Sequence, residues 1–227
     1  LSLHDALPIL STRSRILVAL AAVLLIGMFV TPIWRVFLDA PQYPEGIGMQ
    51  IWINTVKGAK ENDLENINNL NHYIGMKHIS VEMFPEFKFL GILIGLLIAT
   101  GLAAAALGSP RTLFFFTLLS YVYGVAAMWD FWRWGYDYGH NLDPNAAIKV
   151  PDMSYQPPLI GYKNLLNFTS FSGPDIGAWV IIGVCLLATA LWWWEFFKNR
   201  KQVMSAAVRH QAGVALIILS MLTFSAC

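Results

Sequence analysis

Long apolar runs alternate with two polar segments along this chain. Four runs, at residues 16–37, 87–107, 112–132 and 177–197, have roughly the 20 residues that a helix needs to cross the hydrocarbon core of a bilayer. No alternation typical of a membrane β-barrel strand is seen in the sequence, which favours helices. The pattern predicts an all-α membrane protein with a four-helix transmembrane bundle.

The composition agrees with this prediction. Hydrophobic residues make up 56% of the chain and charged residues 13%, whereas a soluble domain carries about 25% charged residues. The formal net charge is +1, which gives no reason to expect a nucleic-acid partner. The lipid bilayer is therefore the first partner that the sequence predicts.

Basic residues gather at the ends of alternate runs, which predicts the orientation. The residues concerned are Arg13, Arg15, Arg111, Lys198, Arg200, Lys201 and Arg209. Positive charge of this kind remains on the cytoplasmic side. We therefore expect an inner-membrane protein of a bacterium, with a cytoplasmic N-terminus. Segments 39–86 and 133–176 are expected to be two outward-facing, periplasmic segments of mixed loop structure.

The two ends of the chain differ from the polytopic membrane domain expected at 10–203. Residues 1–9 resemble a translated sequencing adapter and are set aside as a non-native artefact. Residues 204–227 combine basic residues, a short apolar run and a closing Ser-Ala-Cys227. Two interpretations remain open for this stretch: a lipoprotein-type signal with Cys227 as the lipidated residue, or a truncated fifth helix.

The first outer segment predicts a strand followed by a helix. Residues 48–56 alternate between apolar and polar positions. Asn62, followed by Glu65, resembles a capping box, and the apolar positions up to Ile74 recur at helical spacing before Gly75 ends the helix.

Candidate metal ligands cluster at the end of this helix. His72 lies in its predicted last turn, and Met76 and His78 follow the break. Imidazole and thioether groups suit copper better than magnesium or calcium. The alternative for each residue is structural: His72 caps the helix and Met76 packs beneath it.

The second outer segment contains further titratable residues. Asp130 and Arg133, three residues apart at the outer edge of the third run, predict an interfacial ion pair. Asp137 and His140 follow in a Gly- and Tyr-rich stretch that predicts a turn, where they share either a ligand set or a hydrogen bond. Capping of that turn by His140 is the alternative. Four prolines predict an extended loop beyond residue 144.

Four stretches in these segments carry a family resemblance: 39–49, 67–77, 136–142 and 155–161. They resemble a family of bacterial inner-membrane proteins encoded in nitrous-oxide-reductase gene clusters, beside a copper-delivering accessory lipoprotein. The resemblance covers roughly residues 39–176. It implies His72, Met76 and His140 as the matched positions with metal-ligand chemistry, while His78 and Met83 lie outside the matched stretches. The implied partners are the periplasmic copper-delivering lipoprotein or a cuproenzyme.

Three functions follow from these observations. The leading one is an accessory protein that handles or delivers copper for cuproenzyme maturation, with His72, Met76 and His140 as ligands and Asp137 orienting His140. The second is a scaffold that docks periplasmic partners without metal. The third is a subunit of a membrane oxidoreductase or monooxygenase, with metal held by Asp130, Asp137 and His140. No common catalytic motif occurs in the sequence, so enzymatic activity stays open and a non-enzymatic role is favoured.

Overall fold

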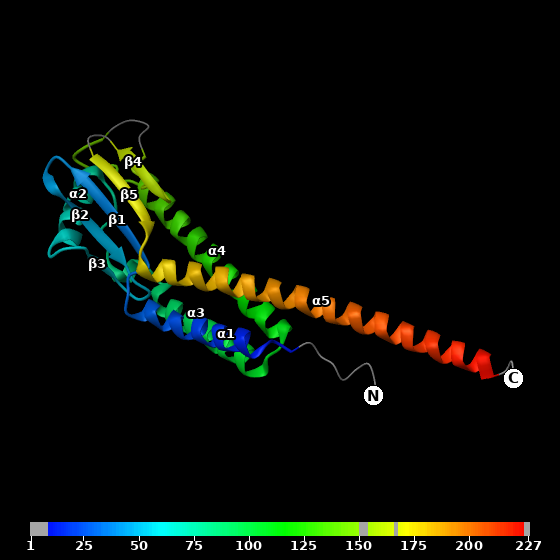
Figure 1. Cartoon of the computed structure of the whole chain (residues 1–227). Helices are drawn as coiled ribbons and strands as arrows, with labels where there is room; N and C mark the ends of the chain where they lie inside the picture. Colours follow the sequence, from blue (N-terminus) through cyan, green and yellow to red (C-terminus); the bar gives the residue numbers. More distant parts are fainter. Residues whose placement is uncertain (1–8, 150–153, 166–167, 225–227) are drawn as a thin grey trace.

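The computed structural model describes residues 9–149, 154–165 and 168–224. Within them, four helical segments are long and apolar enough to cross a membrane, as predicted. They are α1 (Thr12–Leu24) with its 3-10 extension η1 (Leu25–Phe29), α3 (Phe87–Leu107), α4 (Pro110–His140) and the first part of α5 (Ile176–Phe224). Figure 1 shows α1, α3, α4 and α5 side by side below an α/β unit.

Small residues let the helices approach closely. A Cβ added at Gly101 of α3 would lie 2.7 Å from the Cβ of Ala22 on α1 and 2.9 Å from the ring of Phe116 on α4. Since real Cβ atoms do not approach so closely, glycine is required where these three helices meet.

The first membrane segment is shorter than the sequence predicted. It ends at Phe29, and residues Trp34–Ala40 form strand β1. Pro32 lacks the backbone N–H that a continuing helix needs, so the chain leaves the helix there. Three of the residues 34–37 are apolar and continue the run before them, which is why hydrophobicity alone did not separate strand from helix.

The described part of the chain also contains a five-stranded antiparallel sheet, so the protein is mostly helical, as predicted, but not purely all-α. Its order is β3-β2-β1-β5-β4. β1 pairs with β2 (Tyr43–Ile51) on one side and with β5 (Phe168–Pro174) on the other. The edge strands are β3 (Val56–Gly58) and β4 (Gly161–Leu165).

This sheet joins the two outer segments. β2 and β3 belong to the first segment and β4 and β5 to the second. β1, which leads into the first segment, pairs with both β2 and β5, and its Leu38 pairs with Ser170. The two segments therefore contribute to one sheet, with β1 between them. The strand predicted at 48–56 is in fact the β2–β3 hairpin, in which Met49 pairs with Gly58.

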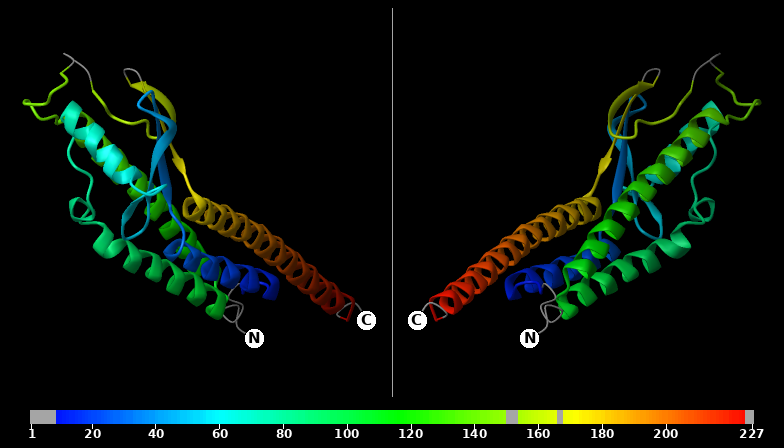
Figure 2. Two further views of the ribbon diagram at one scale, coloured as in Figure 1. Left: turned by 90° about the vertical axis from the view of Figure 1, so that its left-hand side faces the viewer. Right: turned by 90° about the vertical axis from the view of Figure 1, so that its right-hand side faces the viewer.

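The inner face of the sheet is covered by α2 (Asp63–Ile74) and by the outer end of α4 (Figure 2). A second hydrophobic core, separate from that of the bundle, fills this layer with Val36, Ile47, Met49, Ile67 and Tyr138. α2 ends at Gly75 as predicted, but the predicted capping box is absent from its described start. Asn62 has φ +64 and no side-chain cap, while the Asp63 carboxylate accepts hydrogen bonds from Gly48 N and Lys60 N.

α4 extends beyond its predicted end at residue 132, so the predicted Gly- and Tyr-rich turn is wrong. Asp137 and His140 lie in the last turn of this helix. The reason is packing, because Phe131, Trp134 and Tyr138 recur at helical spacing and contact the second hydrophobic core, which is called the outer core below.

The remainder of the second segment was expected to be loop and contains strands β4 and β5. Beyond it, α5 continues as one helix through residues 204–224, where the sequence allowed either a lipoprotein-type signal or a truncated fifth helix. Cys227 and most of the segment 1–9 lie outside the described residues.

Candidate functional site

The end of α2 is fixed to the end of α4. Gly75 ends α2 with φ +80, a left-handed conformation that favours glycine. Its carbonyl oxygen accepts a hydrogen bond of 2.8 Å from Asp143 N, just beyond α4. A Cβ at this position would lie 2.8 Å from the Cβ of Ala146. Gly75 therefore provides both the helix stop and the close approach.

Four side chains complete this junction. Asn71 Nδ2 donates a hydrogen bond of 2.7 Å to the Tyr138 hydroxyl, which in turn donates to the carbonyl oxygen of Lys77. Lys77 Nζ lies 2.6 Å from Asp137 Oδ2 in a solvent-exposed ion pair. Asn71 and Tyr138 are both buried, so their hydrogen bonds fix the stretch that carries the predicted copper ligands.

The predicted ligands of the first segment are in different environments. His72 is exposed in the last turn of α2, and its ring makes an edge-type contact with that of Tyr73. Met76 is half-buried and packs against the outer core. His78 is exposed and lines a shallow hollow beside α2. The two imidazoles are thus accessible to a partner, and the thioether is partly sheltered.

The predicted ligands of the second segment have local partners. The His140 ring stacks on Tyr136 with centroids 4.0 Å apart, and its Nδ1 lies 2.9 Å from the Tyr136 carbonyl oxygen. Asp137 binds Lys77 and accepts a hydrogen bond from Asn141. Its carboxylate therefore has partners other than His140, for which it was the predicted orienting group.

The carboxylates and imidazoles of the outer segments lie apart from one another in groups of fewer than three among the described residues. Among the described residues, no group of three or more His, Cys, Asp and Glu side chains could hold a metal ion. The structure brings the two ligand-bearing segments together at the α2–α4 junction. It does not gather their carboxylates and imidazoles into one preformed cluster in this part of the chain.

The ion pair predicted at the outer edge of the bundle is confirmed. Arg133 Nη2 lies 2.7 Å from Asp130 Oδ1. Glu86, which precedes α3, is a third member of this group that the sequence did not reveal. Partial burial and the neighbouring Asp130 carboxylate raise the pKa of Glu86 above its ordinary value. Glu86, Asp130 and Arg133 thus form a polar contact between the start of α3 and the outer part of α4.

A cavity of about 320 Å³ lies between the inner face of the sheet and helices α2 and α4. Met49 of β2 and Met76 line it together with aliphatic and aromatic side chains. Of the predicted copper ligands, Met76 alone lines this cavity among the residues described. The cavity was not predicted because the sheet that forms one wall was not.

The segment after residue 153 covers the cavity where it crosses α4. Tyr155 N donates a hydrogen bond of 3.0 Å to the Gly139 carbonyl oxygen. A Cβ at Gly139 would lie 2.3 Å from Gln156 N, so only glycine permits the crossing. Tyr155 is thereby held with 2% of its surface exposed. Gly139, which suggested a turn in the sequence, serves this contact within a helix.

These features define a membrane protein in which one α/β unit, with its own core and cavity, stands on a bundle of apolar helices. No family model, curated protein or solved structure matches the chain.

Proposed function

We propose that this chain is a membrane-anchored accessory protein that holds or passes copper at the periplasmic face for maturation of a cuproenzyme such as nitrous oxide reductase. The observation that supports this proposal best is the α2–α4 junction. It joins the stretch bearing His72 and Met76 to the helix end bearing His140 through the Asn71–Tyr138 hydrogen bond. The two ligand sets, far apart in sequence, belong to one rigid connection.

The chemistry of the junction suits transfer rather than permanent storage. Thioether groups favour Cu(I), and neutral imidazole accepts either copper state. Exposed His72 and His140 leave room for ligands from a partner, such as a copper-delivering lipoprotein or the cuproenzyme itself. A donor set that is open and weak on its own releases its ion readily to a stronger site.

Copper retention tests this proposal. The purified protein in nanodiscs is loaded with Cu(I) and its retained metal is measured for His72→Ala, Met76→Leu and His140→Ala. Each substitution should lower retention at least several-fold with unchanged thermal stability. His210→Ala, which removes a histidine of α5, serves as the matched control. Equal retention by the wild type and the His72→Ala/His140→Ala double variant would remove the copper role.

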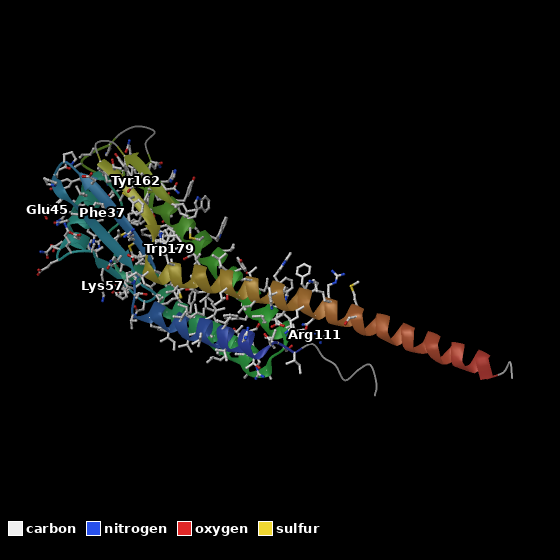
Figure 3. All side chains as sticks on the ribbon, in the orientation of Figure 1. Phe37, Glu45, Lys57, Arg111, Tyr162 and Trp179 are labelled. Atoms are coloured by element: carbon white, nitrogen blue, oxygen red, sulfur yellow. The ribbon has the colours of Figure 1, made fainter. Side chains whose placement is uncertain are left out.

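A second function is favoured by the outer face of the sheet. Phe37 and Tyr162 are exposed there, and the Tyr162 ring lies 4.8 Å from that of Phe171; Figure 3 labels the first two. Exposed aromatic groups of this kind suit a scaffold that docks periplasmic partners. Partner binding that survives loss of copper but is lost in Phe37→Ser/Tyr162→Ser would favour the scaffold.

The third function, a metal-bearing oxidoreductase subunit, has less support. Two of its three expected ligands, Asp130 and Asp137, hold the cationic side chains of Arg133 and Lys77. A metal ion at these carboxylates would have to displace both cations.

A further inference from the structure

We propose that the cavity between the sheet and helices α2 and α4 binds an uncharged molecule that has an apolar body and one hydroxyl or carbonyl group. This site is separate from the exposed histidines of the proposed copper function. The proposal rests on the cavity wall itself and stands whether or not the protein handles copper.

Two buried hydroxyl groups, on residues that line the cavity, carry the proposal. Tyr155 is 2% exposed and Ser170 is 0% exposed, and both line the cavity. Neither hydroxyl has a hydrogen-bond partner among the described residues. Buried polar groups are nearly always hydrogen-bonded in native proteins, so a pair of unpartnered hydroxyls at one cavity indicates a ligand that they bind.

The fold holds these hydroxyls in place from different elements. Ser170 belongs to β5 and pairs with Leu38 of β1, whose side chain also lines the cavity. Tyr155 comes from the segment that crosses α4 at Gly139. A hydroxyl or carbonyl group of the ligand is able to bond to both, because each protein hydroxyl donates one hydrogen bond and accepts others.

The rest of the wall determines the class of ligand. None of the described lining residues carries a formal charge; most are apolar, among them Val36, Ile67, Trp134 and Phe168. An ionic ligand would lose its hydration without gaining a counter-charge, which is strongly unfavourable. An apolar body gains from burial here, and a volume of about 320 Å³ is within the range of small-molecule sites.

The cavity reaches the surface beside the end of α2. Tyr73 is 55% exposed and Ile148 is 48% exposed, and both line the cavity. Ile148 N donates a hydrogen bond of 2.9 Å to the Tyr73 carbonyl oxygen, which links the two sides of this mouth. A ligand of this chemistry has two sources, the neighbouring bilayer and the aqueous phase.

The binding test compares 1-naphthol with naphthalene, which lacks the hydroxyl. Binding to the protein in nanodiscs is measured by calorimetry, with empty nanodiscs as the blank. Tyr155→Phe and Ser170→Ala should each weaken 1-naphthol binding about 3- to 10-fold, the effect of one hydrogen bond, and leave naphthalene binding unchanged. Tyr162→Phe and Thr169→Ala, on exposed or half-buried neighbouring positions, are the matched controls and should change neither.

A further variant, Ala40→Leu, tests the volume of the cavity rather than the two hydroxyl groups. Ala40 is buried in the cavity wall, and Ala40→Leu should abolish binding of both probes while the protein keeps its thermal transition. Failure of the folded wild type to bind either probe would overturn the proposal, as would equal 1-naphthol affinities of wild type, Tyr155→Phe and Ser170→Ala.

Organic extracts of the protein purified from membranes show whether the ligand comes from the bilayer or from the aqueous phase. A neutral lipid that is present at one per chain in the wild type and absent from Ala40→Leu identifies the bilayer as the source. Extracts without such a lipid, together with 1-naphthol binding, identify an aqueous ligand.

Discussion

The side chain of Asn71 and the hydroxyl of Tyr138 are joined by a hydrogen bond of 2.7 Å between residues 67 positions apart. Asn71 is 5% exposed and Tyr138 is 3% exposed. The same hydroxyl donates to the Lys77 carbonyl oxygen, so one phenol bonds to two groups of the first segment. The end of α2 depends on the outer turn of α4 for its position.

Tyr138→Phe should therefore lower the free energy of unfolding by about 1–3 kcal/mol, because it leaves the Asn71 amide and the Lys77 carbonyl without their partner. The loss is expected as a lower thermal transition of the protein in nanodiscs. Tyr136→Phe, which removes an exposed hydroxyl two residues away on the same helix, should change the transition little. Equal effects of the two substitutions would contradict the role of the hydrogen bond.

The opposite end of the bundle has a comparable contact. Glu195 of α5 is fully buried, and its Oε1 accepts hydrogen bonds from Ser11 N (3.0 Å), Ser11 Oγ (2.6 Å) and Ser14 Oγ (2.5 Å). Hydrogen bonds to a carboxylate are worth about 1.5–3 kcal/mol each. Ser14→Ala should lower the stability of the bundle by an amount of this order, whereas Thr12→Ala, at an exposed position of the same turn, should not. Thermal unfolding of both variants gives the comparison.

The raised pKa of Glu86 predicts a pH dependence. The folded protein holds this proton more tightly than the unfolded chain, whose Glu has an ordinary pKa of 4.5. Stability should therefore fall as pH rises from 4.5 through the higher pKa of the folded state. Glu86→Gln should remove this slope when the thermal transition is followed from pH 4 to pH 8.

Glu82→Gln is the matched control for that experiment. A backbone hydrogen bond and Ser80 lower the pKa of Glu82, so this carboxylate contributes stability that is present above pH 4.5 and lost as pH falls. Its removal should change the profile with the opposite sign. Identical profiles for both variants would show that neither pKa shift affects folding.

The predicted orientation is tested by cysteine labelling. In a background without Cys185 and Cys227, cysteines at exposed Lys60 and Lys149 should both react with an impermeant thiol reagent in intact spheroplasts, since both positions belong to the outer unit. A cysteine at Arg111 should react only after lysis, because Arg111 lies at the far end of the bundle in Figure 3. Reaction at only one of the first two positions would contradict a shared periplasmic side.

The apolar helices and α2 were predictable because their signals are local. Runs of about 20 apolar residues identify membrane segments, and the stretch from Asn62 to Gly75 contains its own periodicity and its own stop. The ion pair of Asp130 and Arg133 was predictable for the same reason, since its members are three residues apart on one helix.

The sheet could not be read in this way, because β1 has its partner β5 more than 100 residues away along the chain. The β5 sequence Phe-Thr-Ser-Phe-Ser-Gly-Pro has little apolar content and no strong strand signal of its own. By contrast, the extension of α4 was visible in the helical spacing of Phe131, Trp134 and Tyr138. Gly135 and Gly139 obscured it by suggesting a turn.

The continuity of α4 has a mechanical consequence. Its 31 residues extend about 46 Å at the rise of an α-helix, well beyond the roughly 30 Å of hydrocarbon in a bilayer. No loop separates the part among lipids from the part that holds Tyr138 and His140. A thicker or thinner bilayer changes the tilt of such a helix. Because α4 is continuous, a change in tilt also moves its outer end, and with it the mouth of the cavity and the exposed imidazoles.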